Sequence, residues 1–394
     1  MPSIQASPYP LAFAVAELPA AFRAPPCPED PLALSLRTTA RALEGMQKEA
    51  VVACGGTGTA WRFVCDEGPY LKGTDLAPFP LGYFCAGMVS CYMTELVRLL
   101  REHGISFRNL KLLQDNRYAM AGSALAGTMT GSALPVSLQL VVDSPAPASQ
   151  LQSLLQEAVA QAPVAALLGG VCINEFSLTL NGERLPTQRV ESTIESVPPC
   201  PAGFDTLAPN LLQPTASDLV IKVASAGLHE GVSGGVASSL QENQQRELHM
   251  QGTCVLREDG LQEISVDLFQ PIGSRFRFLA DAMGSTLAPD GLSYLSAGIA
   301  FCFLTQVGRY TTIRKWPLES FELVQDSCFL PARDGQSPRM QPVVTHLFLQ
   351  AALEQADAQR VLDMSEQTCF LHAACRQPVN LDLRELCRAI PIVL

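Results

Sequence analysis

The sequence predicts an α+β fold that is built twice in tandem along one chain. The length of 394 residues suits two domains of ordinary size better than one. Residues 77–118 also align without a gap with residues 288–329, which indicates an internal repeat. In each copy the predicted strands precede a buried helix instead of alternating with helices, and this order is typical of the α+β class.

The repeat is centred on a cysteine in an apolar helix. Each residue of the first segment corresponds to the residue 211 positions later, so that Cys91 corresponds to Cys302. The identical positions of the first copy are Ala77, Pro78, Leu81, Tyr83, Ala86, Gly87, Cys91, Thr94, Arg98, Leu112, Gln114 and Asp115. Weaker similarity relates 154–168 to 361–375 and 62–68 to 277–283.

We therefore predict two tandem domains, at residues 30–185 and 217–390. Residues 186–216 are rich in Pro, Ser and Thr and have little periodicity, which predicts a surface linker between them. The first thirty residues are rich in proline and are predicted to be extended.

Each element of the second copy has its own signal. Two β-rich runs flank a turn at Arg-Glu-Asp-Gly, and the helix that follows Pro289 is apolar on nearly all sides through Phe303. The predicted order is a hairpin within 246–269, a strand at 273–281, the buried helix, strands at 318–326 and 341–350, and a helix at 356–376.

Composition excludes several classes of protein. The net charge of −11 and the lack of a basic run argue against nucleic acid as a partner. We predict a soluble cytoplasmic protein without a membrane span, a secretory leader or a cofactor. Thirteen cysteines, without tight repeated spacing, do not indicate a disulfide scaffold and suit a reducing compartment.

The quoted elements resemble the OsmC/Ohr family, the osmotically inducible and organic hydroperoxide resistance proteins. The shared features are a β hairpin, a helix with "VSCY" or "AFCF", and a later helix with a cysteine in "SEQTCFLHA". The resemblance implies two OsmC-like domains, each with an antiparallel-rich sheet packed on a buried central helix. It also implies that the family's intertwined homodimer is fused here into a monomer with an internal pseudo-twofold axis.

The resemblance also implies roles for individual residues. Cys302 matches the peroxidatic thiol and Cys369 the thiol that resolves it as a disulfide. The activating arginine falls on Arg257 in the second copy. In the first copy Cys91 matches the peroxidatic position, whereas the resolving position falls on Ala162.

Two activating groups of the family are harder to place. The family glutamate falls near Leu81 or Gly82 and near Leu292 or Ser293, none of which is acidic. Asp290 lies close by and is the candidate to replace it in the second copy. The only arginine near the matching hairpin of the first copy is Arg41.

The predicted function is reduction of a small apolar substrate, such as an organic hydroperoxide, with recycling by a thiol reductant. A thiolate is the reactive form of cysteine, so a buried thiol needs a nearby cation. One alternative is a degenerate member whose apolar pocket binds a small ligand. Another is a different cysteine-dependent reaction in a biosynthetic pathway.

Purely structural interpretations of these residues remain open. A buried cysteine is most often a small core residue, and Arg257 also fits an exposed hairpin charge. Cys369, His372 and Cys375 have helical spacing that would let them share a face as metal ligands, but no second cluster completes such a site, and we predict no metal.

Overall fold

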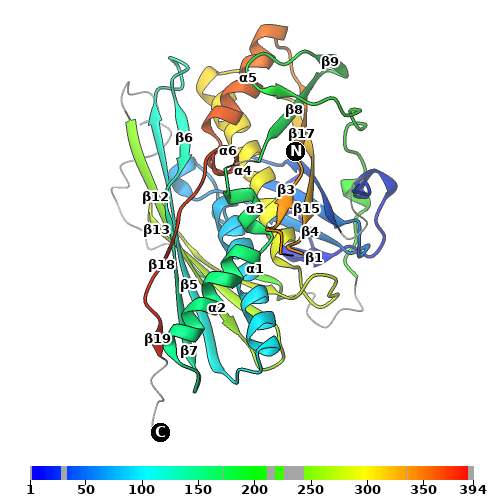
Figure 1. The fold of residues 1–394 in the computed structure, drawn as a ribbon. Coiled ribbons are helices and arrows are strands. Elements are labelled where there is room, and N and C mark those ends of the chain that lie inside the picture. The colour runs from blue at the N-terminus through cyan, green and yellow to red at the C-terminus, as the bar shows by residue number, and fades with distance from the viewer. Residues whose placement is uncertain are drawn as a thin grey trace.

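The computed structural model describes residues 2–27, 33–170, 172–210, 218–225, 244–333 and 335–388. Two long helices, α1 (Pro80–Glu102) and α4 (Gly291–Arg314), lie side by side between two β-sheets (Figure 1). α1 packs on one sheet and α4 on the other, so that the layers run sheet, helix, helix, sheet. This arrangement is the α+β architecture that the sequence predicts.

Each central helix is followed by further helices. In order these are α2 (Ala148–Gln161), α3 (Val164–Leu168), α5 (Gln355–Thr368) and α6 (Phe370–Arg376). Short 3-10 turns are η1 (Ala20–Phe22), η2 (Pro69–Leu71) and η3 (Phe204–Thr206). α2 packs on α1 and α5 packs on α4, which closes the open side of each central helix.

The first sheet lies against α4. Its strand order is β1 (Ala12–Ala14), β4 (Ala60–Cys65), β3 (Lys48–Cys54), β2 (Leu34–Ala42), β15 (Ser320–Leu330), β17 (Val343–Gln350), β8 (Asn174–Leu180) and β10 (Glu191–Ser192). β16 (Arg339–Met340) pairs with β15, and β9 (Glu183–Leu185) pairs with β8.

The second sheet lies against α1. Its strand order is β11 (Val220–Ala224), β14 (Arg275–Ala280), β13 (Gln262–Gln270), β12 (Gln244–Leu256), β5 (Arg108–Gly122), β7 (Val136–Asp143) and β18 (Leu381–Leu383). β6 (Thr130–Ala133) pairs with β5, and β19 (Cys387–Arg388) pairs with β7.

Each sheet combines strands from both halves of the chain. In the first sheet β2 pairs with β15, so that Arg37 lies opposite Asp326. In the second sheet β12 pairs with β5, so that Gln251 lies opposite Asp115. The two predicted copies are therefore interleaved, and each sheet is made of strands from both copies. The boundaries at 30–185, 186–216 and 217–390 stay predictions about the sequence repeat.

The element bounds follow the repeat. α2 and α5 both have 14 residues, and they begin 207 residues apart, at Ala148 and Gln355. β7 and β17 both have 8 residues and also begin 207 residues apart, at Val136 and Val343. These matches support the predicted duplication.

The contact between α1 and α4 is close and nearly symmetric. A Cβ atom on Gly87 would lie 2.6 Å from the backbone nitrogen of Leu295, and one on Gly298 would lie 2.7 Å from the backbone nitrogen of Phe84. Since both glycines and both partners are related by 211 positions, the helices cross at equivalent points. Only glycine allows backbones to approach this closely.

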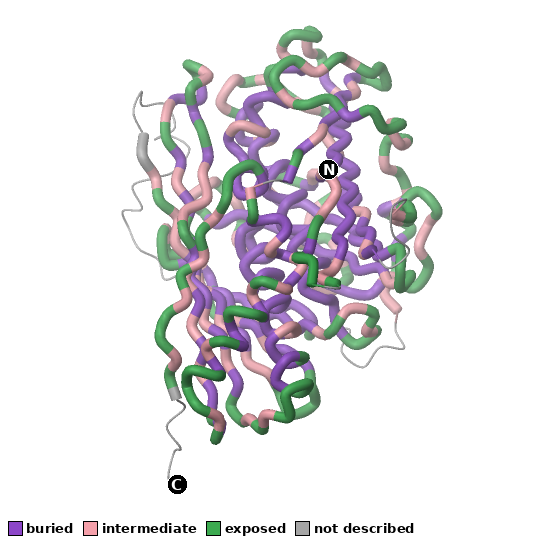
Figure 2. The backbone as a smooth tube through the Cα atoms, viewed as in Figure 1, coloured by how far each residue is buried: buried purple, intermediate pink, exposed green. Residues whose placement is uncertain are grey.

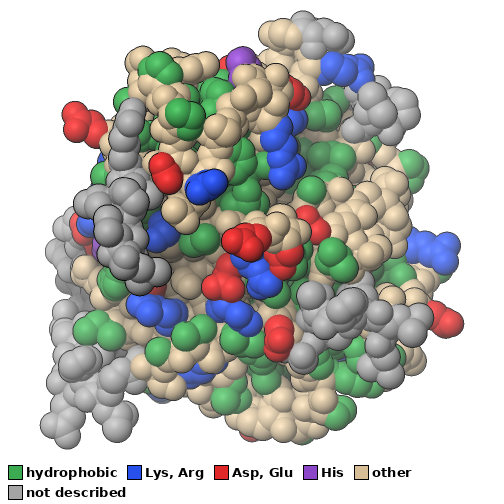
Figure 3. Space-filling view, turned by 90° about the horizontal axis from the view of Figure 1, so that it is seen from below, with side chains coloured by type: hydrophobic (Ala, Val, Ile, Leu, Met, Phe, Trp, Pro, Cys, Tyr) green, Lys and Arg blue, Asp and Glu red, His purple; other side chains and the backbone are tan. Residues whose placement is uncertain are grey.

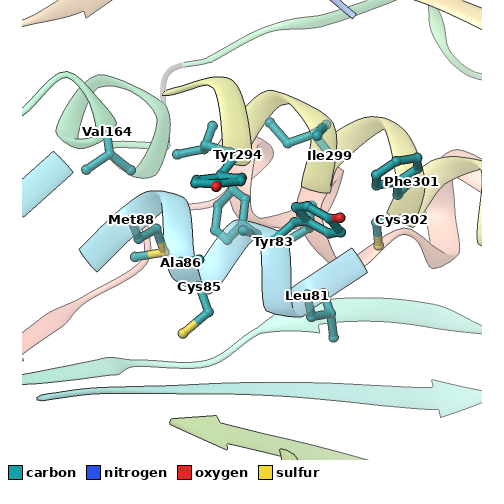
Figure 4. Close-up of a cluster of buried hydrophobic side chains, with 14 of the residues drawn as sticks. Leu81, Tyr83, Cys85, Ala86, Met88, Val164, Tyr294, Ile299, Phe301 and Cys302 are labelled. Carbon is teal, nitrogen blue, oxygen red and sulfur yellow. The ribbon is translucent and has the colours of Figure 1, made fainter. Parts of the chain in front are cut away.

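Two tyrosines lie in the same layer between the helices (Figure 4). The ring centroids of Tyr83 and Tyr294 are 6.1 Å apart. The Tyr83 hydroxyl donates a hydrogen bond to the carbonyl of Val64 at 2.7 Å, and the Tyr294 hydroxyl donates one to the carbonyl of Leu279 at 2.6 Å. Both fully buried hydroxyls are thereby satisfied in the same way.

The core is continuous around α4. Burial is concentrated on the central helices and on the sheet faces that they contact (Figure 2). Among the described residues, α4 is the one helix long and apolar enough to cross a membrane, and 94% of its most apolar window is buried inside the protein. Its uniform apolar character is therefore accounted for by burial against α1, α5 and the first sheet.

The predicted helix at 356–376 is wrong in one respect, because the structure breaks it at Cys369. That residue has φ −73° and ψ 116°, ends α5 and precedes α6. Ala162, its counterpart in the first copy, has a similar extended conformation between α2 and α3. The predicted hairpin, third strand and two later strands of the second copy are confirmed as β12, β13, β14, β15 and β17.

The described part of the predicted linker lies over the first sheet. β10 extends this sheet beside β8, and Asp205 forms an ion pair with Arg41 of β2. Residues 211–216 lie outside the described residues. A disulfide joins Cys27 near the N-terminus to Cys328 of β15, a pairing that the cysteine spacing did not indicate. The face in Figure 3 carries basic and acidic side chains close together near its centre.

Candidate functional site

The structure brings together the two thiols that the sequence singled out. Cys302 lies in the middle of α4 and is 2% exposed, while Cys369 lies at the break between α5 and α6 and is fully buried. Their side chains are within hydrogen-bonding contact. Burial and then the Cys302 side chain raise the pKa of Cys369 well above its ordinary value, which favours the protonated thiol at Cys369.

The break in the helix positions the Cys369 sulfur. Backbone N–H groups of Leu371 and His372 at the start of α6 point at it, and they partly oppose the rise in its pKa. The Nδ1 atom of His372 lies 3.2 Å from the same sulfur. Burial lowers the pKa of His372 to about 3, so the imidazole is neutral at physiological pH.

A glutamate from the other half of the chain lies beside α4. Glu67 follows β4 and is 3% exposed. One carboxylate oxygen accepts a hydrogen bond from the Thr305 hydroxyl at 2.8 Å, and the other accepts one from the Tyr70 hydroxyl at 3.0 Å. Burial raises the pKa of Glu67, while the positive charge of Lys48 is the largest opposing effect.

Lys48 is a buried cation, and a buried thiol needs a nearby cation in order to ionise. It begins β3, is 2% exposed and lies opposite Cys65 of β4 in the sheet. Its Nζ atom donates a hydrogen bond to the carbonyl of Met46 at 2.6 Å. This lysine comes from the first hairpin of the chain, the element on which the family resemblance places the activating cation.

Three polar residues of α4 share one face. Cys302, Thr305 and Arg309 are spaced i, i+3 and i+7, which aligns them along the helix. Arg309 is 6% exposed, and its guanidinium contacts the sulfur of Met120 at 2.8 Å. Burial lowers the pKa of Arg309 to about 10, and the charge of Glu67 opposes this effect.

The Arg309 end of this face reaches a surface pocket of about 170 Å³. Its lining residues are Gly45, Met46, Leu71, Lys72, Arg309 and Thr312. The face of α4 therefore leads from a pocket with apolar and cationic walls toward the buried thiol, about 10 Å along the helix axis.

The corresponding face of α1 keeps Cys91, Thr94 and Arg98 but gives them different partners. Cys91 is 7% exposed and packs against Gly291, where a Cβ atom would lie 2.8 Å from its sulfur. Burial, with Asp290 as the next contribution, raises the pKa of Cys91 far above its ordinary value. Such a thiol is poorly suited to ionise.

The residues that surround the two matching cysteines also differ, and the Cys91 site again has the less reactive groups. Thr94 corresponds to Thr305, but it accepts a hydrogen bond from the Gln262 amide at 2.8 Å instead of binding a carboxylate. In the repeat that relates 62–68 to 277–283, Glu67 corresponds to Ala282. Ala162 occupies the resolving position. The site around Cys91 thus lacks both the carboxylate and the second thiol.

Three sequence-predicted charges are not brought to the thiol pair. Arg257 is exposed at the β12–β13 turn and pairs with Asp259 at 2.7 Å and Glu263 at 3.8 Å, because this hairpin packs on α1 instead of α4. Asp290 is the N-cap of α4, accepts a hydrogen bond from the Ser293 backbone N–H at 3.0 Å and lies near Cys91. Arg41 pairs with Glu49 and Asp205.

The suggested grouping of Cys369, His372 and Cys375 as metal ligands is not formed. Cys375 instead makes a hydrogen-bonded pair with Cys172, which raises the pKa of Cys375 and lowers that of Cys172. His372 faces the rings of Phe303 and Phe176, at centroid distances of 5.1 and 5.4 Å.

Sequence reasoning did not predict Glu67 and Lys48, because it assigned to each cysteine only residues of the same copy. Strand exchange carries β3 and β4 of the first copy onto α4 of the second copy. The signal that would have found Glu67 is the pairing of 62–68 with 277–283, where one copy has a glutamate and the other an alanine.

Comparison with known proteins identifies one family. Residues 284–384 match the sequence model of a family described as OsmC-like protein. No curated protein is significantly similar to the chain. A crystal structure of an OsmC-like hydroperoxide resistance protein from Jannaschia sp. CCS1 matches with 20% identity and a TM-score of 0.20, over 28% of this chain and 75% of that chain. Cys302 and Cys369 lie within the matched segment, whereas Lys48 and Glu67 lie outside it.

Proposed function

The chain belongs to the OsmC-like family through residues 284–384, and on that premise we propose that it is a thiol peroxidase for small apolar organic hydroperoxides. The observation that carries this proposal is the contact between the thiols of Cys302 and Cys369 beside the buried Glu67 carboxylate. Two thiols in contact are what a peroxidatic and a resolving cysteine need.

The first step is attack by the Cys302 thiolate on one oxygen of the hydroperoxide. The O–O bond breaks, the sulfur becomes a sulfenic acid, and the alkoxide takes up a proton and leaves as an alcohol. Lys48 and Arg309 supply positive charge on this side of α4, where the negative charge of the alkoxide develops.

In the second step the Cys369 thiol attacks the sulfenic sulfur. A disulfide forms and water leaves, which prevents further oxidation of Cys302. The disulfide is returned to two thiols by exchange with an external dithiol reductant. We place this cycle in the cytoplasm, in a monomer whose internal pseudo-twofold axis replaces the usual pair of subunits.

Glu67 has a positioning role in this scheme. Its carboxylate is held by Thr305 and Tyr70 and lies within the field of Lys48. It orients the helix turn that follows Cys302 and offsets the buried positive charges when no substrate is bound. The site around Cys91, with Ala282 and Ala162 at the matching positions, is inactive in this proposal.

The test is peptide mass mapping after one equivalent of cumene hydroperoxide, with free thiols alkylated before digestion. We expect rapid formation of a Cys302–Cys369 disulfide and its absence in Cys302→Ser. Cys91→Ser is the matched control and keeps the disulfide. The proposal fails if both thiols remain alkylatable in folded protein.

A second candidate is a cysteine-dependent protein without peroxide turnover, which binds a small apolar ligand or performs another reaction. It is favoured by the lysine at the place where the family resemblance expects an arginine and by the 2% exposure of Cys302. Alkylation of Cys302 by iodoacetamide without any reaction with hydroperoxide would select this candidate.

A further inference from the structure

Three potential metal ligands meet on the outer face of the first sheet, away from the thiol pair. They are Glu195 of the predicted linker, Asp326 of β15 and His346 of β17. One ligand atom from each lies within 4.8 Å of the other two. Ligand atoms this close together can bind one ion after small side-chain movements, so the spacing suits a single bound cation.

His346 is placed and oriented so that it can coordinate a metal ion. His346 is 1% exposed, and a neutral imidazole ring can donate a lone pair to a metal ion. The Ser177 hydroxyl lies 2.8 Å from Nδ1 and fixes the orientation of the ring. A hydrogen bond of this kind behind a ligating histidine is the usual support of protein metal sites.

The cluster has an excess of negative charge. Burial, followed by repulsion from Asp326 and Glu175, raises the pKa of Glu195, and Arg37 only partly opposes this effect. Arg37 holds both Asp326 oxygens, at 2.8 and 2.6 Å. Each carboxylate oxygen has a second lone pair, so Asp326 can bind a cation while it keeps Arg37.

The corresponding place on the other sheet differs. Asp115, which corresponds to Asp326, bonds to His249 at 2.8 Å and pairs with Arg384 at 3.2 Å. There Asp115 meets a histidine and an arginine, whereas on the first sheet Asp326 meets Arg37 and lies beside the second carboxylate of Glu195. The ligand set on the first sheet is therefore a specific feature of that face and does not follow from the repeat.

We propose that Glu195, Asp326 and His346 bind one divalent transition-metal ion, which fastens the segment between the two copies to the first sheet. One imidazole and two carboxylates suit ions such as Mn²⁺ and Zn²⁺. The ion is structural, because the three ligands lie on the outer face while the thiols lie on α4, on the inner side of the sheet. The inference does not depend on the proposed peroxidase activity.

The test is titration of the full chain with Mn²⁺, followed by loss of the EPR signal of the free ion. Mn²⁺ is chosen because it prefers oxygen and nitrogen ligands, so the many free thiols do not compete. After removal of metals with a chelator, we expect one saturable site per chain. Glu195→Gln and His346→Gln should weaken binding at least tenfold.

Glu191→Gln is the matched control, since Glu191 is an exposed glutamate in the same segment, and it should bind Mn²⁺ as the wild type does. Glu195 is exposed, so its variant is expected to fold even if the His346 variant does not. The proposal is overturned if no saturable binding is found up to about 1 mM Mn²⁺, or if Glu195→Gln binds as tightly as the wild type.

Discussion

Glu67 accepts a hydrogen bond at 2.8 Å from Thr305, a residue 238 positions later in the chain. This bond joins the loop after β4 of the first half to the turn of α4 that follows Cys302. Its counterpart on the other helix is the contact between Thr94 and Gln262, which carries no charge. The two matched contacts therefore differ in charge, and this adds to the difference between Cys369 and Ala162.

We predict that Glu67→Gln lowers the rate of hydroperoxide reduction by about 10²-fold, because the variant removes the only negative charge in this contact while nearly keeping its shape. Stopped-flow measurement of peroxide consumption checks it. Thr305→Val should also slow the reaction, whereas Thr94→Val, its partner in the first copy, should not. Equal rates for Thr305→Val and Thr94→Val would show that the hydrogen bond between Thr305 and Glu67 does not contribute to the reaction.

The two thiols should differ in kinetics. Cys369→Ser is expected to consume about two equivalents of hydroperoxide per chain and then stop, because one equivalent forms the sulfenic acid of Cys302 and, with no partner thiol, a second oxidises it to sulfinic acid. Cys302→Ser should consume none. Peroxide assay combined with intact-protein mass measures both results, and steady turnover by Cys369→Ser would show that another thiol resolves Cys302.

Stability should fall in mild acid because of buried neutral histidines. Burial lowers the pKa of His372 from 6.5 to about 3. The folded state therefore binds fewer protons than the unfolded state between these values, so the free energy of unfolding decreases as pH falls below about 6.5. At pH 5 the loss from His372 is about 2 kcal/mol.

His372→Phe should remove this contribution, since a phenyl ring fits between Phe176 and Phe303 and cannot take up a proton. Urea unfolding at pH 7 and pH 5 compares the two proteins. We expect a smaller difference between the two pH values in the variant. The same difference in both proteins would mean that His372 becomes charged without unfolding.

The crossing of α1 and α4 should not tolerate a methyl group at Gly298. Because a Cβ atom there would lie 2.7 Å from the backbone of Phe84, Gly298→Ala is expected to destabilise the protein by about 2 kcal/mol despite the better helix propensity of alanine. Gly308→Ala in the same helix meets only the ring of Phe321, at 3.3 Å, and should be neutral or slightly stabilising. Thermal unfolding of both variants and of the wild type measures these two changes in stability.

Much of the fold could be predicted because its signals are local. The apolar helix around Cys302 and the strands of the second copy are confirmed, and the repeat aligned the two helices that cross at Gly87 and Gly298. The thiol pair could also be predicted, since the family resemblance assigned both cysteines from short motifs.

The rest depends on contacts between distant segments. No local pattern indicates that β4 crosses to the other half, so Glu67 and Lys48 could not be assigned to Cys302, and Arg257 was placed at the wrong helix. The break at Cys369 was not predicted because residues 365–373 contain neither glycine nor proline, the usual signals of a helix end. The disulfide between Cys27 and Cys328 joins residues 301 positions apart and has no signal in cysteine spacing.

The interleaving of strands within one chain has a genetic consequence. In a homodimer every substitution appears in both subunits, so a change that ruins one catalytic centre ruins the other. Here each position is encoded separately, so alanines stand at the matching positions of the Cys91 site, Ala162 and Ala282, while the Cys302 site has Cys369 and Glu67. Because both halves complete the same two sheets, neither half can be deleted, and the residues around Cys91 persist as part of the scaffold on which the Cys302 site depends.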